Sequence, residues 1–223
     1  AKLPISDSEL EQFTNLYKAT YDFSKDALKQ FDIVKGDKIA YWYDNNDDDR
    51  YVEGGGSLNN SCMASVDSDY FDIYTQNSQV SLVILYGDDG TIKDGKYTAD
   101  MIKGRAILWD CKIDGTPAKF MDRIYTTLDA DVELFKQYAE KEGFWYKKRQ
   151  SMEPSEEVTN GSGSRKATIE VKLDDAVFEY YPYCDTICYI NSETGTACNV
   201  HWDDADRMLR DTSGGYEDAY DMD

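Results

Sequence analysis

The sequence has few basic residues and almost no histidine. It holds 24 Lys and Arg residues against 44 Asp and Glu residues, and His201 is its single histidine. The formal net charge is −20 at pH 7. A surface of this charge repels nucleic-acid phosphates and anionic lipids, which argues against direct binding to DNA, RNA or a membrane surface. It favours either plain solubility or attraction to a basic protein surface, including one that normally holds DNA.

Long apolar runs are also missing from the 223 residues. No stretch approaches the roughly 18 apolar residues of a membrane-spanning helix. The first residues, AKLPISDSELEQF, contain no apolar core of a signal peptide, so we expect the protein to stay where it is made. The five cysteines are an odd number in a chain too large to need disulfides, which favours free thiols in a reducing compartment.

The first 150 residues are expected to form an α+β core domain. Ser6 and Glu9 make a capping box for a helix over residues 6–21, whose apolar stripe contains Leu10, Phe13, Leu16, Tyr17 and Thr20. A short helix over 24–31 follows, and the aromatic segment 36–44 is typical of a strand. Residues 45–61 are expected to be a polar loop, and residues 69–77 a short helix.

Three strong strand patterns follow, over 79–87, 102–111 and 118–126. Loops rather than helices join them, so we expect an antiparallel meander whose first strand is covered on both faces. Asp129 is the expected N-cap of the next helix and Gly143 its C-cap, with a buried stripe of Val132, Phe135, Tyr138 and Ala139.

A strand over 144–150 should close the core domain, and residues 151–166 form the expected linker. Residues 167–223 are expected to form a small C-terminal β extension that contains a hairpin around NSETG and ends in an acidic tail. The predicted fold is therefore a mixed, largely antiparallel central sheet with flanking helices, plus this extension.

The order of these elements over roughly residues 6–150 resembles the fold of GNAT-class N-acetyltransferases. That resemblance implies a loop after the central strand whose backbone N–H groups, at a helix N-terminus, hold the pyrophosphate of coenzyme A. The corresponding segment here, YTTLDADVELF (125–135), has no glycine and no basic residue. Its carboxylates, Asp129, Asp131 and Glu133, would repel a pyrophosphate, so we interpret the segment as scaffold.

Several segments are also similar to parts of uncharacterised proteins encoded by tailed bacteriophages. They are FDIVKGDKIAYWY, GSLNNSCM, IKGRAILW, MDRIYT and YYPYCDT with LRDTSGGYE. The resemblance implies a phage product in the host bacterial cytoplasm or in the virion. It implies no catalytic residues.

Cys62 is the best candidate nucleophile. It follows a Gly-rich loop and precedes an apparent helix, whose N-terminus would lower the pKa of the thiol. The only imidazole base, His201, lies far along the chain. The competing interpretation is a small buried thiol beside Met63.

Asp122 and Tyr125 are further candidates for an active site in the strand 118–126. Asp122 and Arg123 are neighbours on that strand, so we expect their side chains to point to opposite faces. An inward ion pair between Asp122 and Arg105 is the structural alternative to a catalytic acid.

Cys184, Cys188, Cys198 and His201 have a spacing that could build a tetrahedral zinc site. In an extended strand, however, Cys184 and Cys188 would lie about 13 Å apart at ~3.3 Å per residue. Ordinary strand cysteines are therefore the competing interpretation, and we expect no other cofactor.

These observations predict a non-enzymatic, acidic interaction protein of a bacteriophage. It would bind a basic host or phage protein, for example at a site that normally holds nucleic acid, or serve as a virion component. The alternative is an acyltransferase-like enzyme that uses an atypical donor or another small ligand.

Overall fold

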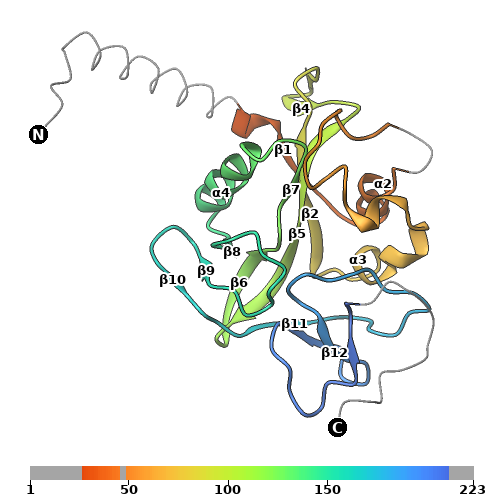
Figure 1. Cartoon of the computed structure of the whole chain (residues 1–223), viewed down its shortest axis with the longest axis vertical. Helices are drawn as coiled ribbons and strands as arrows, with labels where there is room; N and C mark the ends of the chain where they lie inside the picture. Colours follow the sequence, from red (N-terminus) through yellow and green to blue (C-terminus); the bar gives the residue numbers. More distant parts are fainter. Residues whose placement is uncertain (1–26, 46–48, 211–223) are drawn as a thin grey trace, which may run out of the picture.

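The computed structural model describes residues 27–45 and 49–210. Over these ranges the chain is α+β, with a large curled mixed sheet and three α-helices (Figure 1). This confirms the predicted class and the mixed sheet. The helix expected over 6–21, the start of the one over 24–31 and most of the acidic tail lie outside the described residues. No helix of the described part is long and apolar enough to cross a membrane.

Strand β5 (Ile102–Ile113) organises the sheet. One of its edges pairs with β2 (Val80–Tyr86) and then with β11 (Ile169–Lys172). Its other edge pairs with β7 (Tyr125–Thr126) and β6 (Thr116–Met121). All four pairings are antiparallel, so the predicted meander of β2, β5 and β6 is confirmed. The sheet is mixed because β6 and β8 (Trp145–Lys147) run parallel.

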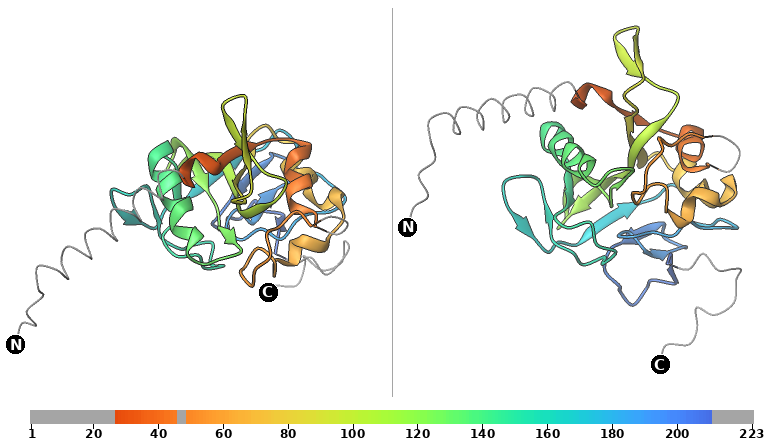
Figure 2. Two further views of the ribbon diagram at one scale, coloured as in Figure 1. Left: turned by 90° about the horizontal axis from the view of Figure 1, so that it is seen from above. Right: turned by 45° about the horizontal axis from the view of Figure 1, so that its top comes forward.

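The remaining elements surround this centre. The helices are α2 (Asp37–Tyr43), α3 (Asp72–Thr75) and α4 (Asp131–Glu142), with 3₁₀ turns η1 (Leu28–Gln30), η2 (Cys62–Ser65) and η3 (Ser68–Phe71). The other strands are β1 (Phe31–Val34), β3 (Thr91–Lys93), β4 (Lys96–Thr98), β9 (Val158–Thr159), β10 (Ser164–Arg165), β12 (Tyr189–Asn191), β13 (Thr196–Cys198) and β14 (Arg207–Met208). Strands β3 and β4 form a separate hairpin that projects from the body (Figure 2).

The sheet buries apolar side chains on both faces, because alternate residues of β2 and β5 point to opposite sides. Leu82, Ile84 and Trp109 belong to the larger core, which α2, α3 and the C-terminal strands cover. Val83 and Leu85 belong to a smaller core under α4. All seven residues of β2 are buried, as the sequence predicts for a strand covered on both faces.

The strand predicted over 36–44 is wrong, because this segment forms helix α2. Its buried residues are Ile39, Trp42 and Tyr43, at the i, i+3, i+4 spacing of a helix face. Gly36, with φ of 60°, starts the turn into the helix. The aromatic content suggested a strand, but packing against α3 and η3 decides the local structure.

Three smaller expectations also differ from the structure. The helix predicted over 24–31 gives way to strand β1 at Phe31, which pairs with Leu85 of β2. Helix α4 begins at Asp131, after a turn in which Asp131 N–H bonds the Leu128 carbonyl, so Asp129 is not its N-cap. The expected linker 151–166 contains β9 and β10, which extend the sheet from β8. The C-cap at Gly143 is confirmed, with φ of 75°.

The C-terminal strands continue the same sheet. β11 shows the expected alternation of buried and exposed residues and pairs with both β5 and β13. β12 and β13 form the predicted hairpin, closed by the Gly195 N–H bond to the Asn191 carbonyl.

Candidate functional site

A polar cluster lies where the β6–β7 connection meets the segment before β12. Its side chains surround a cavity of about 20 Å³, lined by Asp122, Arg123, Tyr125 and Asp185 together with Tyr183 and residues near η2. A cavity of this size holds roughly one water molecule. Two of the three predicted catalytic residues, Asp122 and Tyr125, therefore share one small pocket.

The local backbone explains why Asp122 and Arg123 line the same cavity. The expected strand 118–126 is interrupted after Met121 and resumes at Tyr125. Asp122 N–H still bonds the Ile107 carbonyl at 2.8 Å, but Ile124 N–H turns to the side chain of Gln150 at 2.7 Å. The prediction that Asp122 and Arg123 point to opposite faces is wrong, because that alternation holds only along a continuous strand.

Asp185 is the acceptor at the centre of the cluster. Arg123 Nη1 donates to its Oδ1 at 3.0 Å, and the Tyr125 hydroxyl donates to its Oδ2. Burial, and then the neighbouring Asp185 carboxylate, raise the pKa of Tyr125 well above its usual range. The phenol therefore stays protonated and acts as a donor at any physiological pH.

Asp122 is a second, differently placed carboxyl group. It accepts hydrogen bonds from the Thr186 hydroxyl, from Trp109 Nε1 at 3.3 Å and from the Arg123 backbone at 2.7 Å. Burial raises the pKa of Asp122, and the charge of nearby Lys147 opposes that shift. Lys147 is itself buried, which lowers its pKa, and it donates to two backbone carbonyls.

The predicted ion pair between Arg105 and Asp122 does not form. Arg105 is fully buried, and its Nη1 donates to the carbonyls of Trp42 at 2.9 Å and Tyr43 at 3.2 Å and to the hydroxyl of Tyr51. Its guanidinium lies 3.7 Å from the centre of the Tyr43 ring. The β5 register places Arg105 beside the C-terminal end of α2, where carbonyl oxygens favour a cation.

Cys62 lies at the edge of this region. It is the first residue of η2 and its thiol is exposed, so the interpretation as a buried thiol is wrong. Its neighbours Ser61 and Met63 line the cavity, but Cys62 does not. Within residues 27–45 and 49–210 no hydrogen bond joins Cys62 to His201, whose exposed ring instead contacts Tyr189 edge-on.

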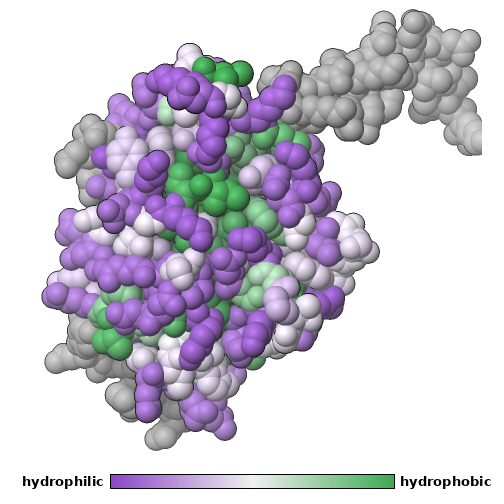
Figure 3. Space-filling view, turned by 180° about the vertical axis from the view of Figure 1, so that it is seen from behind, coloured by the Kyte–Doolittle hydropathy of each residue, from purple (hydrophilic) through white to green (hydrophobic). Residues whose placement is uncertain are grey.

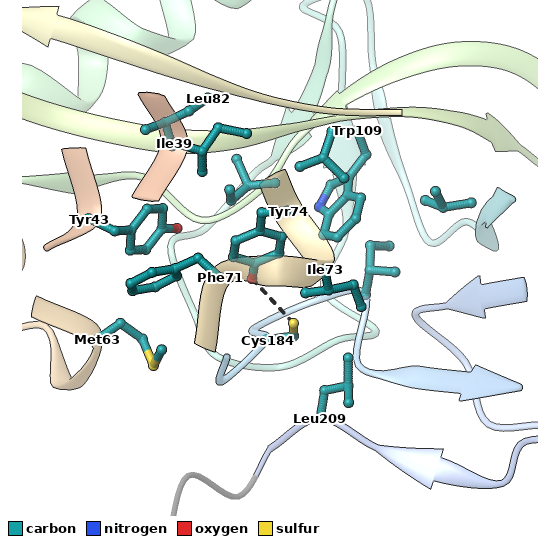
Figure 4. Close-up of a cluster of buried hydrophobic side chains, with 14 of the residues drawn as sticks. Ile39, Tyr43, Met63, Phe71, Ile73, Tyr74, Leu82, Trp109, Cys184 and Leu209 are labelled. Carbon is teal, nitrogen blue, oxygen red and sulfur yellow. Dashed lines mark hydrogen bonds between the residues drawn. The ribbon is translucent and has the colours of Figure 1, made fainter. Parts of the chain in front are cut away.

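The four predicted zinc ligands are not assembled. Cys184 lies among buried apolar side chains and is hydrogen-bonded to the Tyr74 hydroxyl at 3.3 Å (Figure 4). Cys188 and Cys198 are also buried, whereas His201 is exposed. Burial raises the pKa of Cys188 to about 11, so the thiol is protonated at neutral pH. In the described part of the chain, no three His, Cys, Asp or Glu residues are grouped so that they could hold a metal ion.

The first turn of α4 carries carboxylates where an acetyltransferase would hold its donor. Asp131 is buried there, and burial raises its pKa while Lys103 opposes the shift. Glu133 is exposed and pairs with Lys136 at 2.6 Å. This helix N-terminus thus presents acidic groups rather than free N–H donors to an anion.

A second feature lies on the surface over η3. The rings of Tyr70 and Tyr180 stack with centroids 4.9 Å apart, and Asp67, Asp69 and Glu179 are exposed around them. We call these five residues the acidic aromatic face. The Glu179 carboxylate, and to a smaller extent Asp69, raise the pKa of the Tyr180 phenol. Among the described residues, no Lys or Arg forms an ion pair with these three carboxylates.

Sequence reasoning missed Asp185, Thr186 and Lys147 as partners of Asp122. A signal was present, since Asp185 and Thr186 interrupt an otherwise apolar and aromatic run, AVFEYYPYCDTICYI. Polar groups in such a run need partners when they are buried.

Comparison with protein-family models, with curated proteins and with solved structures found no match to this chain. The acetyltransferase-like layout is accordingly not confirmed, and the functional argument depends on the residues themselves.

Proposed function

We propose that this protein is a non-enzymatic, acidic interaction protein that binds a basic protein through its acidic aromatic face. The observation that carries the proposal is the combination of Asp67, Asp69 and Glu179, which have no cation of their own, with the exposed stack of Tyr70 on Tyr180. Lysine and arginine side chains bind both carboxylates and aromatic faces. A net charge of −20 adds long-range attraction to any basic partner.

The buried polar cluster supports a structural role rather than catalysis. Both oxygens of Asp185 and both oxygens of Asp122 accept hydrogen bonds from within the protein. The cavity beside them, about 20 Å³, has space for a water molecule but not for an acyl donor. A satisfied network of this kind typically fixes how separate segments meet.

The sequence resemblance to phage proteins gives the proposal its biological setting. The partner would be a basic host or phage protein, met in the bacterial cytoplasm or in the virion. A partner that normally binds DNA or RNA suits the charge best, because the acidic aromatic face offers both negative charge and stacked rings, as nucleic acid does.

Affinity capture from bacterial lysate tests this proposal with three proteins. These are the natural chain, the variant Asp67→Asn/Asp69→Asn/Glu179→Gln, and a control with the same change of charge, Glu193→Gln/Asp203→Asn/Asp204→Asn, all at exposed positions. We expect the natural chain and the control to capture the same basic protein, which high salt releases. The face variant should capture roughly tenfold less of it. Equal capture by all three proteins would contradict the assignment to this face.

A further inference from the structure

A wide groove lies on the other side of the molecule from the acidic aromatic face. It has a volume of about 580 Å³ and runs between η1 and β1, the β3–β4 hairpin and the C-terminal end of α4. We call it the hairpin groove. Apolar side chains line it: Leu28, Phe31, Ile92, Tyr97 and Tyr138. Figure 3 shows the face of the molecule opposite to that of Figure 1, where polar side chains dominate and apolar ones gather in the upper half.

The hairpin holds this groove open. Asp94 and Gly95, both with positive φ, form the tight turn between β3 and β4, and the hairpin stands clear of the main sheet (Figure 2). Tyr97 anchors its base, since the phenol donates to the Gly87 carbonyl at 2.7 Å. Ile92 is left 72% exposed above the groove. A branched apolar side chain in that position is typical of a surface that another segment covers.

The floor of the groove is aromatic and rigid. Phe31 of β1 stacks on Tyr138 of α4 with ring centroids 4.4 Å apart and nearly parallel planes. Phe31 also meets Phe135 edge-on at 4.8 Å. These contacts fix the floor, so a ligand would find a preformed apolar surface.

The charge around the groove differs from that of the rest of the chain. Three lysines and two carboxylates line it, Lys29, Lys96, Lys141, Asp32 and Glu142, which gives +1 in a protein of net charge −20. Lys96 is 3.2 Å from Asp32. The groove therefore suits an apolar segment with acidic flanks better than it suits a basic one.

The chain itself supplies such a segment. The described residues begin at Ala27, which lines the groove, so residues 1–26 join the molecule at this place. The sequence of residues 6–21 predicts an amphipathic helix with Leu10, Phe13, Leu16 and Tyr17 in its stripe. It carries three acidic residues and one lysine, a net charge of −2.

We propose that the apolar stripe of residues 6–21 docks in the hairpin groove of the same chain. The five residues 22–26 can span up to roughly 17 Å when extended, enough for the segment to reverse direction over the groove. The contact would cover Ile92 and the Phe31–Tyr138 floor. It does not depend on the proposed binding of a basic partner, because the acidic aromatic face is formed by other residues.

Hydrogen exchange of the full chain, followed by mass spectrometry, tests the docking. Residues 6–21 should exchange on the order of tenfold more slowly in the natural chain than in the variant Ile92→Asp. Val177→Asp is the matched control, because Val177 is 62% exposed and does not line the groove. The reciprocal variant Leu10→Asp/Phe13→Asp should speed exchange in 91–98, whereas Ser8→Asp/Asn15→Asp, on the opposite side of the predicted helix, should not.

The results separate the possible occupants. Slow exchange of residues 6–21 that is independent of protein concentration and lost in Ile92→Asp supports docking within one chain. Protection that grows with protein concentration would overturn it in favour of a second copy. Equal exchange of residues 6–21 in the natural chain and in Ile92→Asp would overturn it outright.

Discussion

The Tyr125 hydroxyl donates a hydrogen bond to the carboxylate of Asp185, across 60 residues of sequence. Tyr125 belongs to β7 at the edge of β5, and Asp185 belongs to the segment that leads to β12. This single bond, with the ion pair from Arg123, ties the C-terminal strands to the centre of the sheet. The cluster is therefore a structural junction, and its removal should be felt in stability.

The variant Tyr125→Phe should lower the free energy of unfolding by about 1–2 kcal/mol, because Asp185 loses a buried donor and its charge is less well satisfied. Urea unfolding followed by circular dichroism measures this loss. Tyr41→Phe is the matched control, since Tyr41 is exposed and its ring contact with Arg50 survives the change. Equal stability of Tyr125→Phe and the natural chain would contradict the junction.

The variant Arg105→Lys should be more damaging, with a loss of about 2–4 kcal/mol. A lysine cannot reach the two α2 carbonyls and the Ser61 hydroxyl together, and its charge would be buried without the planar stacking on Tyr43. Arg149→Lys, on an exposed residue, should leave the unfolding midpoint unchanged. A stable Arg105→Lys protein would show that the guanidinium fork is dispensable.

The pKa of Asp122 gives a prediction on pH dependence. Burial raises this pKa in the folded state above the ordinary value of 3.8. The folded state therefore binds the proton more tightly than the unfolded state, and stability is lost as pH rises from 3.8 towards the folded pKa. The natural chain should lose stability over this window relative to Asp122→Asn, which has no such proton. Parallel profiles for the two proteins, measured by urea unfolding at each pH, would contradict the shift.

Thiol reactivity should distinguish one cysteine from the other four. Cys62 is exposed, whereas Cys111, Cys184, Cys188 and Cys198 are buried. Burial raises the pKa of Cys111 to about 12, which further slows its reaction. We expect an aromatic disulfide reagent to label one thiol per folded chain quickly and five in denaturant. The variant Cys62→Ser should label none quickly. Two or more fast thiols in the folded natural chain would disprove this arrangement.

The strands of the core could be predicted because each pattern is local. The continuous apolar run of β2 and the alternation in β11 are visible without any knowledge of their neighbours. Gly143 likewise marks the end of α4 through its own backbone preference.

Other features depend on contacts that a single segment does not reveal. Helix α2 has strand-like residues but packs its Ile39, Trp42 and Tyr43 face on α3 and η3. The sequence placed Asp122 opposite Arg105, because it could not show that the strand breaks at Asp122. Asp185 reaches that break only through the curl of the sheet, so the polar cluster could not be assembled from spacing alone.

The most direct test of the central claim is the salt dependence of the captured complex. Binding of the purified partner would be measured by calorimetry from about 0.1 M to about 1 M NaCl, where the Debye length falls from roughly 10 Å to 3 Å. The account predicts a steep loss of affinity for the natural chain and for Glu193→Gln/Asp203→Asn/Asp204→Asn. It predicts a weaker complex with a shallower salt slope for Asp67→Asn/Asp69→Asn/Glu179→Gln. Affinity that is indifferent to salt, or identical slopes for all three proteins, would contradict binding through the acidic aromatic face.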